Sequence, residues 1–221
     1  MMIAPADMTL DELRAALARR LPRHAVFDGW GGTALAAAAA ELDVPADRAA
    51  LCFPGGAIDM IDAWFAEIDT TMAETLAAQG VSGMKIRDRI RAALIARLDE
   101  AAHYPDALRR AMAILARPDN AARTARLGWR AADAMWHAVG DRSVDLAWYT
   151  KRATLGAVYA ATLMAWMDDD SEDFVETRAF LDRRIDDVMK IETLKARLKP
   201  QPDRHFSPSR FLGRLRYRTA R

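Results

Sequence analysis

Residues 33–76 read TALAAAAAELDVPADRAALCFPGGAIDMIDAWFAEIDTTMAETL, in the order helix, turn, short helix, turn and long helix. The alanine-rich run from Thr33 to Leu42 favours a helix by propensity alone. Asp43-Val44-Pro45 and Phe53-Pro54-Gly55-Gly56 are typical turn sequences. Apolar residues then recur every three or four positions, as on one face of a helix; they are Ile61, Phe65, Ile68, Met72 and Leu76.

This order of elements resembles the helix-turn-helix head of TetR-type regulators, with Val44 at the apolar position of the turn. A capping box from Thr9 to Glu12 predicts an earlier helix, which we expect to end at Pro22. Gly80 is expected to stop the long helix.

The helical pattern continues to the end of the body, with breaks before Pro105 and at Pro118 and Gly140. We predict an all-α, TetR-like bundle of about nine helices. Residues 1–80 would form a degenerate helix-turn-helix head with its connecting helix. Residues 81–199 would form a ligand-binding body, as one compact unit with the head, and residues 200–221 a linker and a basic amphipathic C-terminal helix.

The composition of the 221 residues, 52% hydrophobic and 29% charged, is that of a globular protein. The single Cys52 excludes an internal disulfide and a multi-cysteine zinc site. The first residues lack the pattern of a secretion signal. The longest uncharged run, Ala153 to Met167, is shorter than the roughly 20 residues that cross a bilayer. We therefore expect a cytoplasmic chain.

Charge is distributed unevenly along the sequence. Residues 1–80 hold 12 acidic residues against five arginines, and residues 195–221 hold nine lysines or arginines against one acid. A head that docks on DNA needs a basic surface, but the candidate recognition helix offers only Asp47 and Arg48 as charges. We therefore expect no nucleic-acid partner, although a TetR-type regulator that senses an apolar ligand is kept as the alternative function.

No pattern in the sequence predicts catalysis or a metal. Glu100 and His103 have the Glu-x-x-His spacing of di-iron bundles, but the second copy that such a site needs is missing, so we expect a surface pair. The acids of residues 168–173 lack the spacing of a calcium loop and are expected to form a solvated helix start. Phosphate-binding, dinucleotide-binding and nucleophile motifs are also missing, so we predict a protein that is not an enzyme.

The uncharged run from Ala153 to Met167 mixes small residues with large apolar ones. It could be a central helix packed on all sides, or the wall of a pocket for an apolar ligand, since methionine and aromatic groups adapt to such ligands. Periodicity does not separate the two. The predicted lipid-binding residues are Met112, Leu115, Leu155, Tyr159, Leu163, Met164 and Trp166.

Trp148, Arg152 and Tyr159 lie on one face of the same predicted helix, and tryptophan with arginine is typical of a binding hot spot. An aromatic core capped by Arg152 is the alternative, while Trp136 and Tyr149 near the helix start favour an interface.

At the C-terminus, Ser207-Pro208 can start a helix with arginines opposite apolar residues, as in helices that lie on anionic membranes. A disordered basic tail and a nucleic-acid arm are the alternatives. The predicted membrane-binding residues are Arg210, Phe211, Leu212, Arg214, Leu215, Arg216 and Arg218.

The segment from Met135 to Met189 is the most specific part of the chain. It contains Met135-Trp136-His137, then Trp148-Tyr149-Thr150-Lys151-Arg152, then three aspartates followed by Phe174 and Phe180-Leu181. In order and spacing these motifs resemble the coenzyme Q (ubiquinone) accessory protein family, the ninth of the numbered Coq series. The resemblance implies a TetR-type fold without DNA binding and a bound isoprenoid quinone or phospholipid in place of a cofactor. It also implies a partner, the di-iron demethoxyubiquinone hydroxylase, to which a quinone intermediate is presented.

The same resemblance assigns the partner-binding surface and the location. The partner-binding residues would be Met135, Asp145, Trp148, Tyr149 and Arg152. Two positions depart from the family pattern, with Leu163 in place of an acid and Arg178 in place of a tryptophan. We expect a homodimer that is peripheral to the cytoplasmic (inner) membrane of a bacterium.

Overall fold

In the computed structural model, residues 4–141 and 146–198 are described, and they form ten α-helices, four short 3-10 helices and no strand. The predicted all-α class is confirmed. The helices are α1 (Leu10–Ala18), α2 (Leu21–Asp28), α3 (Gly32–Ala40), α4 (Ala46–Leu51), α5 (Ala57–Gln79), α6 (Ile86–Ala102), α7 (Pro105–Leu115), α8 (Ala121–Ala138), α9 (Leu146–Met167) and α10 (Val175–Leu198). The 3-10 helices are η1 (Pro5–Asp7), η2 (Val81–Gly83), η3 (Pro118–Asn120) and η4 (Glu172–Phe174).

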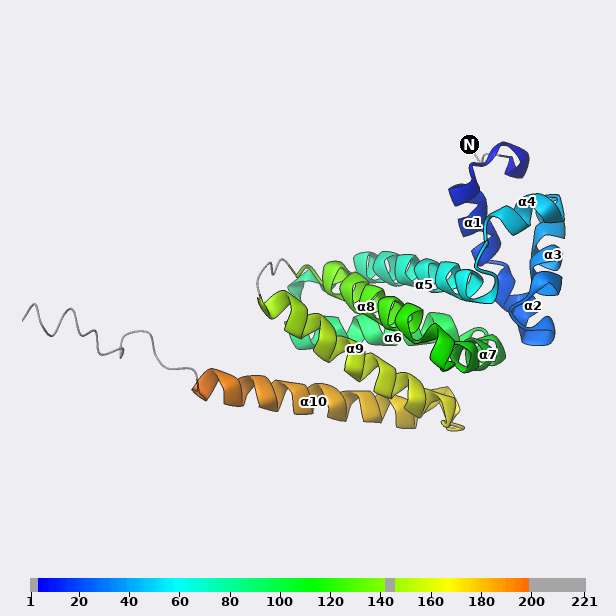
Figure 1. The fold of residues 1–221 in the computed structure, drawn as a ribbon. Helices are drawn as coiled ribbons and strands as arrows, with labels where there is room; N and C mark the ends of the chain where they lie inside the picture. Colours follow the sequence, from blue (N-terminus) through cyan, green and yellow to red (C-terminus); the bar gives the residue numbers. More distant parts are fainter. Residues whose placement is uncertain (1–3, 142–145, 199–221) are drawn as a thin grey trace, which may run out of the picture. The chain divides into compact units, whose positions relative to one another are not determined.

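Helices α1 to α4 form a head at the N-terminal end of α5 (Figure 1). The predicted capping box is present, because the Glu12 backbone N–H donates to Thr9 Oγ1 at 3.3 Å and the Thr9 N–H donates to Glu12 Oε2 at 2.8 Å. The prediction that Pro22 ends the first helix is wrong. Helix α1 ends at Ala18 and Pro22 lies in the first turn of α2, where its missing N–H costs no hydrogen bond.

The predicted helix-turn-helix consists of α3, a turn and α4. Asp43 in the turn has φ 52°, a left-handed conformation that aspartate tolerates better than most residues. Val44 is buried, as expected for the apolar turn position. Helix α5 then runs for 23 residues and ends at Gly80, whose φ of 64° is easily reached without a Cβ. The five apolar residues that predicted the inner face of α5 are all buried.

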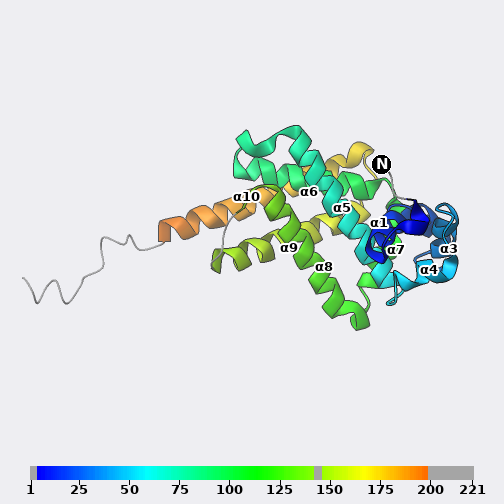
Figure 2. The same ribbon diagram turned by 90° about the horizontal axis from the view of Figure 1, so that it is seen from above.

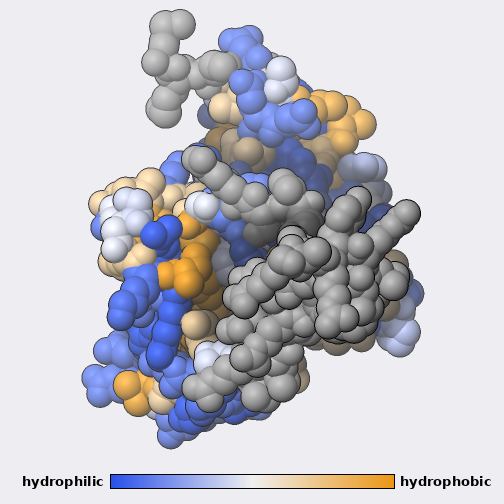
Figure 3. Space-filling model, turned by 90° about the vertical axis from the view of Figure 1, so that its left-hand side faces the viewer, coloured by the Kyte–Doolittle hydropathy of each residue, from blue (hydrophilic) through white to orange (hydrophobic). Residues whose placement is uncertain are grey.

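The body is built around α5, which packs against α6 and α8, while α8 also packs against α9 (Figure 2). Two tryptophans join the core of the head to the core of the body. The ring of Trp30, in the head, is stacked on that of Trp64, in α5, with 5.2 Å between their centres. On the face shown in Figure 3, hydrophobic residues reach the surface in patches bordered by hydrophilic ones.

The chain divides into two compact units, residues 1–185 and 186–221, so head and body fall in the same unit and the boundary lies inside α10. In the described part of the second unit, α10 carries an exposed ion pair, with Lys190 Nζ 3.5 Å from Asp187 Oδ1. None of the helices in the described ranges has both the length and the apolarity to cross a bilayer.

Candidate functional site

Three aromatic side chains meet at the surface where α8 and the start of α9 lie together. The ring of Trp129 on α8 is 5.5 Å from that of Trp148 and 6.2 Å from that of Tyr149, both on α9. Trp148 and Tyr149 pack edge to face at 4.8 Å. Trp129 is 36% exposed and Tyr149 59% exposed, so these three residues, the aromatic patch, offer apolar area together with polar ring groups to solvent.

Arg152 lies beneath the aromatic patch and is only 1% exposed. Its guanidinium stacks on the Trp148 ring at 4.1 Å and donates from Nη1 to the Trp148 carbonyl at 3.2 Å. Two carboxylates neutralise it: Asp133 Oδ1 is 2.5 Å from Nε, and Asp141 Oδ2 is 3.4 Å from Nη1. The charge therefore holds Trp148 in place from inside the protein.

A second cation supports the same region. Lys151 Nζ is 2.7 Å from Asp141 Oδ1 and lies 5.1 Å from the centre of the Trp136 ring. Asp141 thus joins Lys151 and Arg152. The indole N–H of Trp136 is buried without a hydrogen-bond partner in the described part of the chain.

The predicted partner-binding residues have different positions in this arrangement. Trp148 and Tyr149 belong to the aromatic patch, whereas Met135 is fully buried and Arg152 nearly so. Asp145 lies outside the described residues. Trp129 was not predicted from the sequence. It packs against Trp148 of another helix, and no sequence periodicity links positions 129 and 148.

The predicted lipid-binding residues separate into two groups. Leu155, Tyr159, Leu163 and Trp166 are buried along one face of α9, and from α7 Leu115 is buried and Met112 partly buried. Met164 is 56% exposed and therefore lies away from the buried face. It does not line the same interior region as the others.

Arginines flank the aromatic members of this buried face. The guanidinium of Arg97 lies 5.0 Å from the centre of the Tyr159 ring, and that of Arg109 lies 5.8 Å from the Trp166 ring. Trp166 also packs on Phe174 with 5.1 Å between ring centres. Its indole N–H has no hydrogen-bond partner among the described residues. The face is thus apolar, with polar groups at its edge, a composition typical of sites for amphipathic ligands.

The predicted solvated start of α10 needs a correction at Asp169, which is 6% exposed. Its carboxylate accepts hydrogen bonds from the backbone N–H of Ser171 and Thr177, both at 2.8 Å, and from their hydroxyls at 2.5 and 2.6 Å. Burial raises the pKa of Asp169, but these hydrogen bonds outweigh it and hold the pKa of the carboxyl well below its usual range. The ionised group fixes the turn between α9 and α10.

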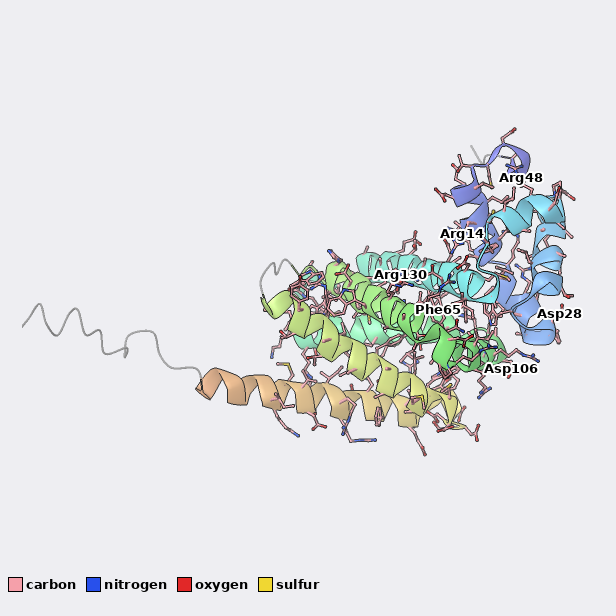
Figure 4. The ribbon with its side chains drawn as sticks, in the orientation of Figure 1. Arg14, Asp28, Arg48, Phe65, Asp106 and Arg130 are labelled. Atoms are coloured by element: carbon pink, nitrogen blue, oxygen red, sulfur yellow. The ribbon has the colours of Figure 1, made fainter. Side chains whose placement is uncertain are left out.

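Other predicted sites are located as follows. Glu100 and His103 form a surface pair at the end of α6, with His103 Nδ1 3.9 Å from Glu100 Oε2. In α4, a helix of only six residues, Arg48 points back to the start of the chain and donates to the Met8 carbonyl at 2.6 Å (Figure 4). The predicted membrane-binding residues, 210–218, lie outside the described residues.

Comparison with known proteins finds related sequences. The profile of the COQ9 family matches residues 121–192. The mitochondrial ubiquinone biosynthesis protein COQ9-A of Xenopus laevis is 31% identical over 172 residues, which cover 73% of this chain and 53% of that protein. The mitochondrial ubiquinone biosynthesis protein COQ9 of Homo sapiens is 30% identical over 182 residues, which cover 77% of this chain and 54% of that protein.

Among solved structures, the crystal structure of the TetR transcriptional regulator from Nitrosomonas europaea is similar, with a TM-score of 0.62 and 25% sequence identity. The match covers 79% of this chain and 97% of that one. The TetR-like fold predicted from the sequence is confirmed by this likeness.

The chain spans about half the length of the curated relatives it matches. These relatives are mitochondrial proteins of eukaryotes, including one of Dictyostelium discoideum. The predicted location, cytoplasmic and peripheral to a bacterial inner membrane, is therefore corrected, because the relatives give it no support.

Proposed function

Because residues 121–192 and the curated relatives show that this chain belongs to the COQ9 family of ubiquinone biosynthesis proteins, we propose that it is a non-enzymatic, lipid-binding accessory protein. In this proposal it binds a quinone intermediate and presents it to the di-iron hydroxylase that acts on demethoxyubiquinone. The single observation that carries the proposal is the aromatic patch of Trp129, Trp148 and Tyr149 over the buried Arg152.

The aromatic patch has the properties of a docking surface for a protein. Tryptophan and tyrosine bury much area and lose little conformational freedom on binding, which is why they dominate binding hot spots. Here their freedom is restricted further, because Arg152 fixes Trp148 from below and Tyr149 packs against its edge. A surface that is already ordered loses less entropy when a partner binds.

The buried face of α9 is the proposed lipid-contacting region. Tyr159 and Trp166 supply apolar area, and Met112 of α7 can adjust its shape to a chain that enters. A lipid bound there would replace contacts that these side chains now make with one another. Two of the three patch residues, Trp148 and Tyr149, lie on the same helix as this face, so α9 would contact both the lipid and the partner.

A transcriptional regulator is the second candidate, and the likeness to the Nitrosomonas europaea regulator favours it. The chemistry of α4 disfavours it. Arg48, the basic residue of that short helix, donates to backbone carbonyls of Pro5 and Met8 instead of facing outward. DNA binding needs several cations on the docking surface.

The proposal is tested by the quinone profile of cells that lack this gene, measured by mass spectrometry after complementation with wild type, Trp148→Ala or Phe27→Ala. Phe27 is 80% exposed on the head and serves as the control for loss of an exposed aromatic group. We expect demethoxyubiquinone to accumulate without the gene and with Trp148→Ala, and ubiquinone to be restored by wild type and Phe27→Ala. An unchanged profile in the deletion strain would contradict the proposal.

A further inference from the structure

Asp62 of α5 is shared by two arginines, one from the head and one from the body. Arg14 of α1 places Nη2 3.5 Å from Asp62 Oδ2. Arg130 of α8 forms an ion pair with the other carboxylate oxygen and donates from Nη2 to the Asp62 carbonyl at 2.9 Å. Figure 4 shows Arg14 in the head and Arg130 in the body, both beside α5. One carboxylate therefore connects α1 with α8.

Arg14 also holds the turn between α4 and α5. It donates to the Cys52 carbonyl at 2.6 Å and to the Asp59 carbonyl at 2.9 Å, and its guanidinium lies 5.0 Å from the centre of the Phe53 ring. A single side chain thus links three segments, namely α1, the turn and the first part of α5. Backbone carbonyls are fixed acceptors, so this arginine has little freedom to reorient.

Asp59, about one turn before Asp62 on α5, makes a similar connection between the α4–α5 turn and α8. Its Oδ1 is 3.1 Å from Arg123 Nη1 of α8, and its Oδ2 accepts a hydrogen bond from the Gly55 N–H at 2.5 Å. Further along α5, Asp69 forms an ion pair with Arg97 of α6, which is 1% exposed. Arg130 Nε lies 3.5 Å from the same Asp69, so the arginine that meets Asp62 is itself held on two sides.

A second contact between head and body is made by Trp30, which lies between α2 and α3 and is 5% exposed. Its indole N–H donates to the Ala107 carbonyl of α7 at 2.9 Å, and its ring stacks on Trp64 of α5. A rotation of the head relative to the body would have to break the contacts of both Arg14 and Trp30.

We propose that these contacts lock the head to the body, with Asp62 as the shared point of attachment, so that α1 to α4 move with the body as one unit. A head that answers a ligand by changing its position would need this attachment to be weak. The lock is independent of the quinone proposal, because none of its members belongs to the aromatic patch.

Hydrogen–deuterium exchange, followed peptide by peptide, tests the lock in the full chain with Asp62→Asn. Asp119→Asn is the matched control, since Asp119 also pairs with an arginine, Arg117 at 2.9 Å, but is exposed and outside the head. We expect backbone exchange in α1 and in the α4–α5 turn to become about tenfold faster with Asp62→Asn, and exchange in α9 to stay unchanged.

Unchanged exchange in the head would overturn the proposal, as would acceleration by the same factor throughout the chain. Arg14→Gln provides a second test from the head side. Arg14→Gln also removes the hydrogen bonds to the Cys52 and Asp59 carbonyls. If Asp62 acts on the head through Arg14, the Arg14→Gln and Asp62→Asn double variant should exchange no faster in α1 than Arg14→Gln alone. Additive acceleration would show that the residues act separately.

Discussion

Arg152 and Asp169 are charged residues of the body that are nearly inaccessible to solvent. A buried charge is costly unless hydrogen bonds and opposite charges replace water. Arg152 has two carboxylates, a carbonyl and an aromatic face, and Asp169 has four hydrogen-bond donors. Each residue therefore stabilises a particular local geometry, the base of the aromatic patch in one case and the turn before α10 in the other.

Replacing Arg152 by methionine is expected to lower the free energy of unfolding by about 3 kcal/mol, because Asp133 and Asp141 would lose their buried counter-charge. Urea unfolding at pH 7 measures the change. Arg126→Met, at an exposed position of α8, is the control and should change stability by less than about 0.5 kcal/mol. An equal loss in both variants would show that Arg152 has no special role.

The pKa of Asp169 predicts how stability depends on pH. Since the folded-state pKa is below the unfolded value, its contribution is present at pH values above the unfolded pKa and is lost as pH falls below it. Asp169→Asn should cost about 2 kcal/mol at pH 7 and less at pH 3, where the wild type has begun to lose the same contribution. Asp170→Asn, at the exposed neighbouring position, is the control in urea titrations at both pH values. A loss that is as large at pH 3 as at pH 7 would contradict this assignment.

At the scale of elements, helix α9 carries no charged residue after Arg152 and packs against α8. Leu155, Tyr159, Leu163 and Trp166 face the core. Gly156 faces α8, where an added Cβ would lie 3.8 Å from Ala132 Cβ and 3.9 Å from the Gly128 carbonyl. These are ordinary van der Waals distances. The glycine is therefore not required by the packing of the two helices.

Gly156→Ala is expected to stabilise the protein by about 0.5–1 kcal/mol, because alanine has the higher helix propensity and the site has room for its methyl group. Gly80→Ala is expected to destabilise by about 1 kcal/mol, because the φ of 64° at the end of α5 disfavours a residue with a Cβ. Thermal unfolding of the two variants beside the wild type compares them. A destabilising Gly156→Ala would mean that α8 and α9 cannot accept the added volume.

Hydrophobic periodicity predicted most elements, since the inner face of α5 and the breaks at proline and glycine were visible in the sequence. Helix α2 was missed because Pro22 was interpreted as a stop, although proline is equally suited to a first turn. Part of the candidate site was visible as Trp148 and Tyr149. The carboxylates that pair with Arg152 were not visible, because Asp133 and Arg152 meet only after α8 and α9 pack. Burial of a charge depends on such tertiary partners, which a single sequence does not display.

At the scale of the whole molecule, the acidic excess of residues 1–80 has a structural explanation. Five of its 12 acids lie on α5, and three of these, Asp59, Asp62 and Asp69, meet arginines from α6 and α8. Part of the excess is therefore neutralised within the first compact unit.

The basic residues near the C-terminus give a separate prediction, argued from sequence alone. Residues 203–221 carry six arginines against Asp203, and each arginine near an anionic membrane surface contributes about 1 kcal/mol of attraction. The full chain should sediment with vesicles that contain anionic phospholipid, and removal of residues 203–221 should abolish this binding. Neutral phosphatidylcholine vesicles are the control. Equal binding to both kinds of vesicle would contradict an electrostatic attachment.

The most direct test is the affinity of the purified full chain for its proposed partner, the di-iron demethoxyubiquinone hydroxylase, measured by calorimetry. Trp148→Ala and Trp129→Ala change the aromatic patch, and Phe27→Ala is the control on the head. We predict that each patch variant weakens binding by about tenfold or more, as expected for a hot-spot tryptophan, while Phe27→Ala binds like the wild type. Wild-type affinity in both patch variants, with their folds intact, would contradict the claim that this surface receives the partner.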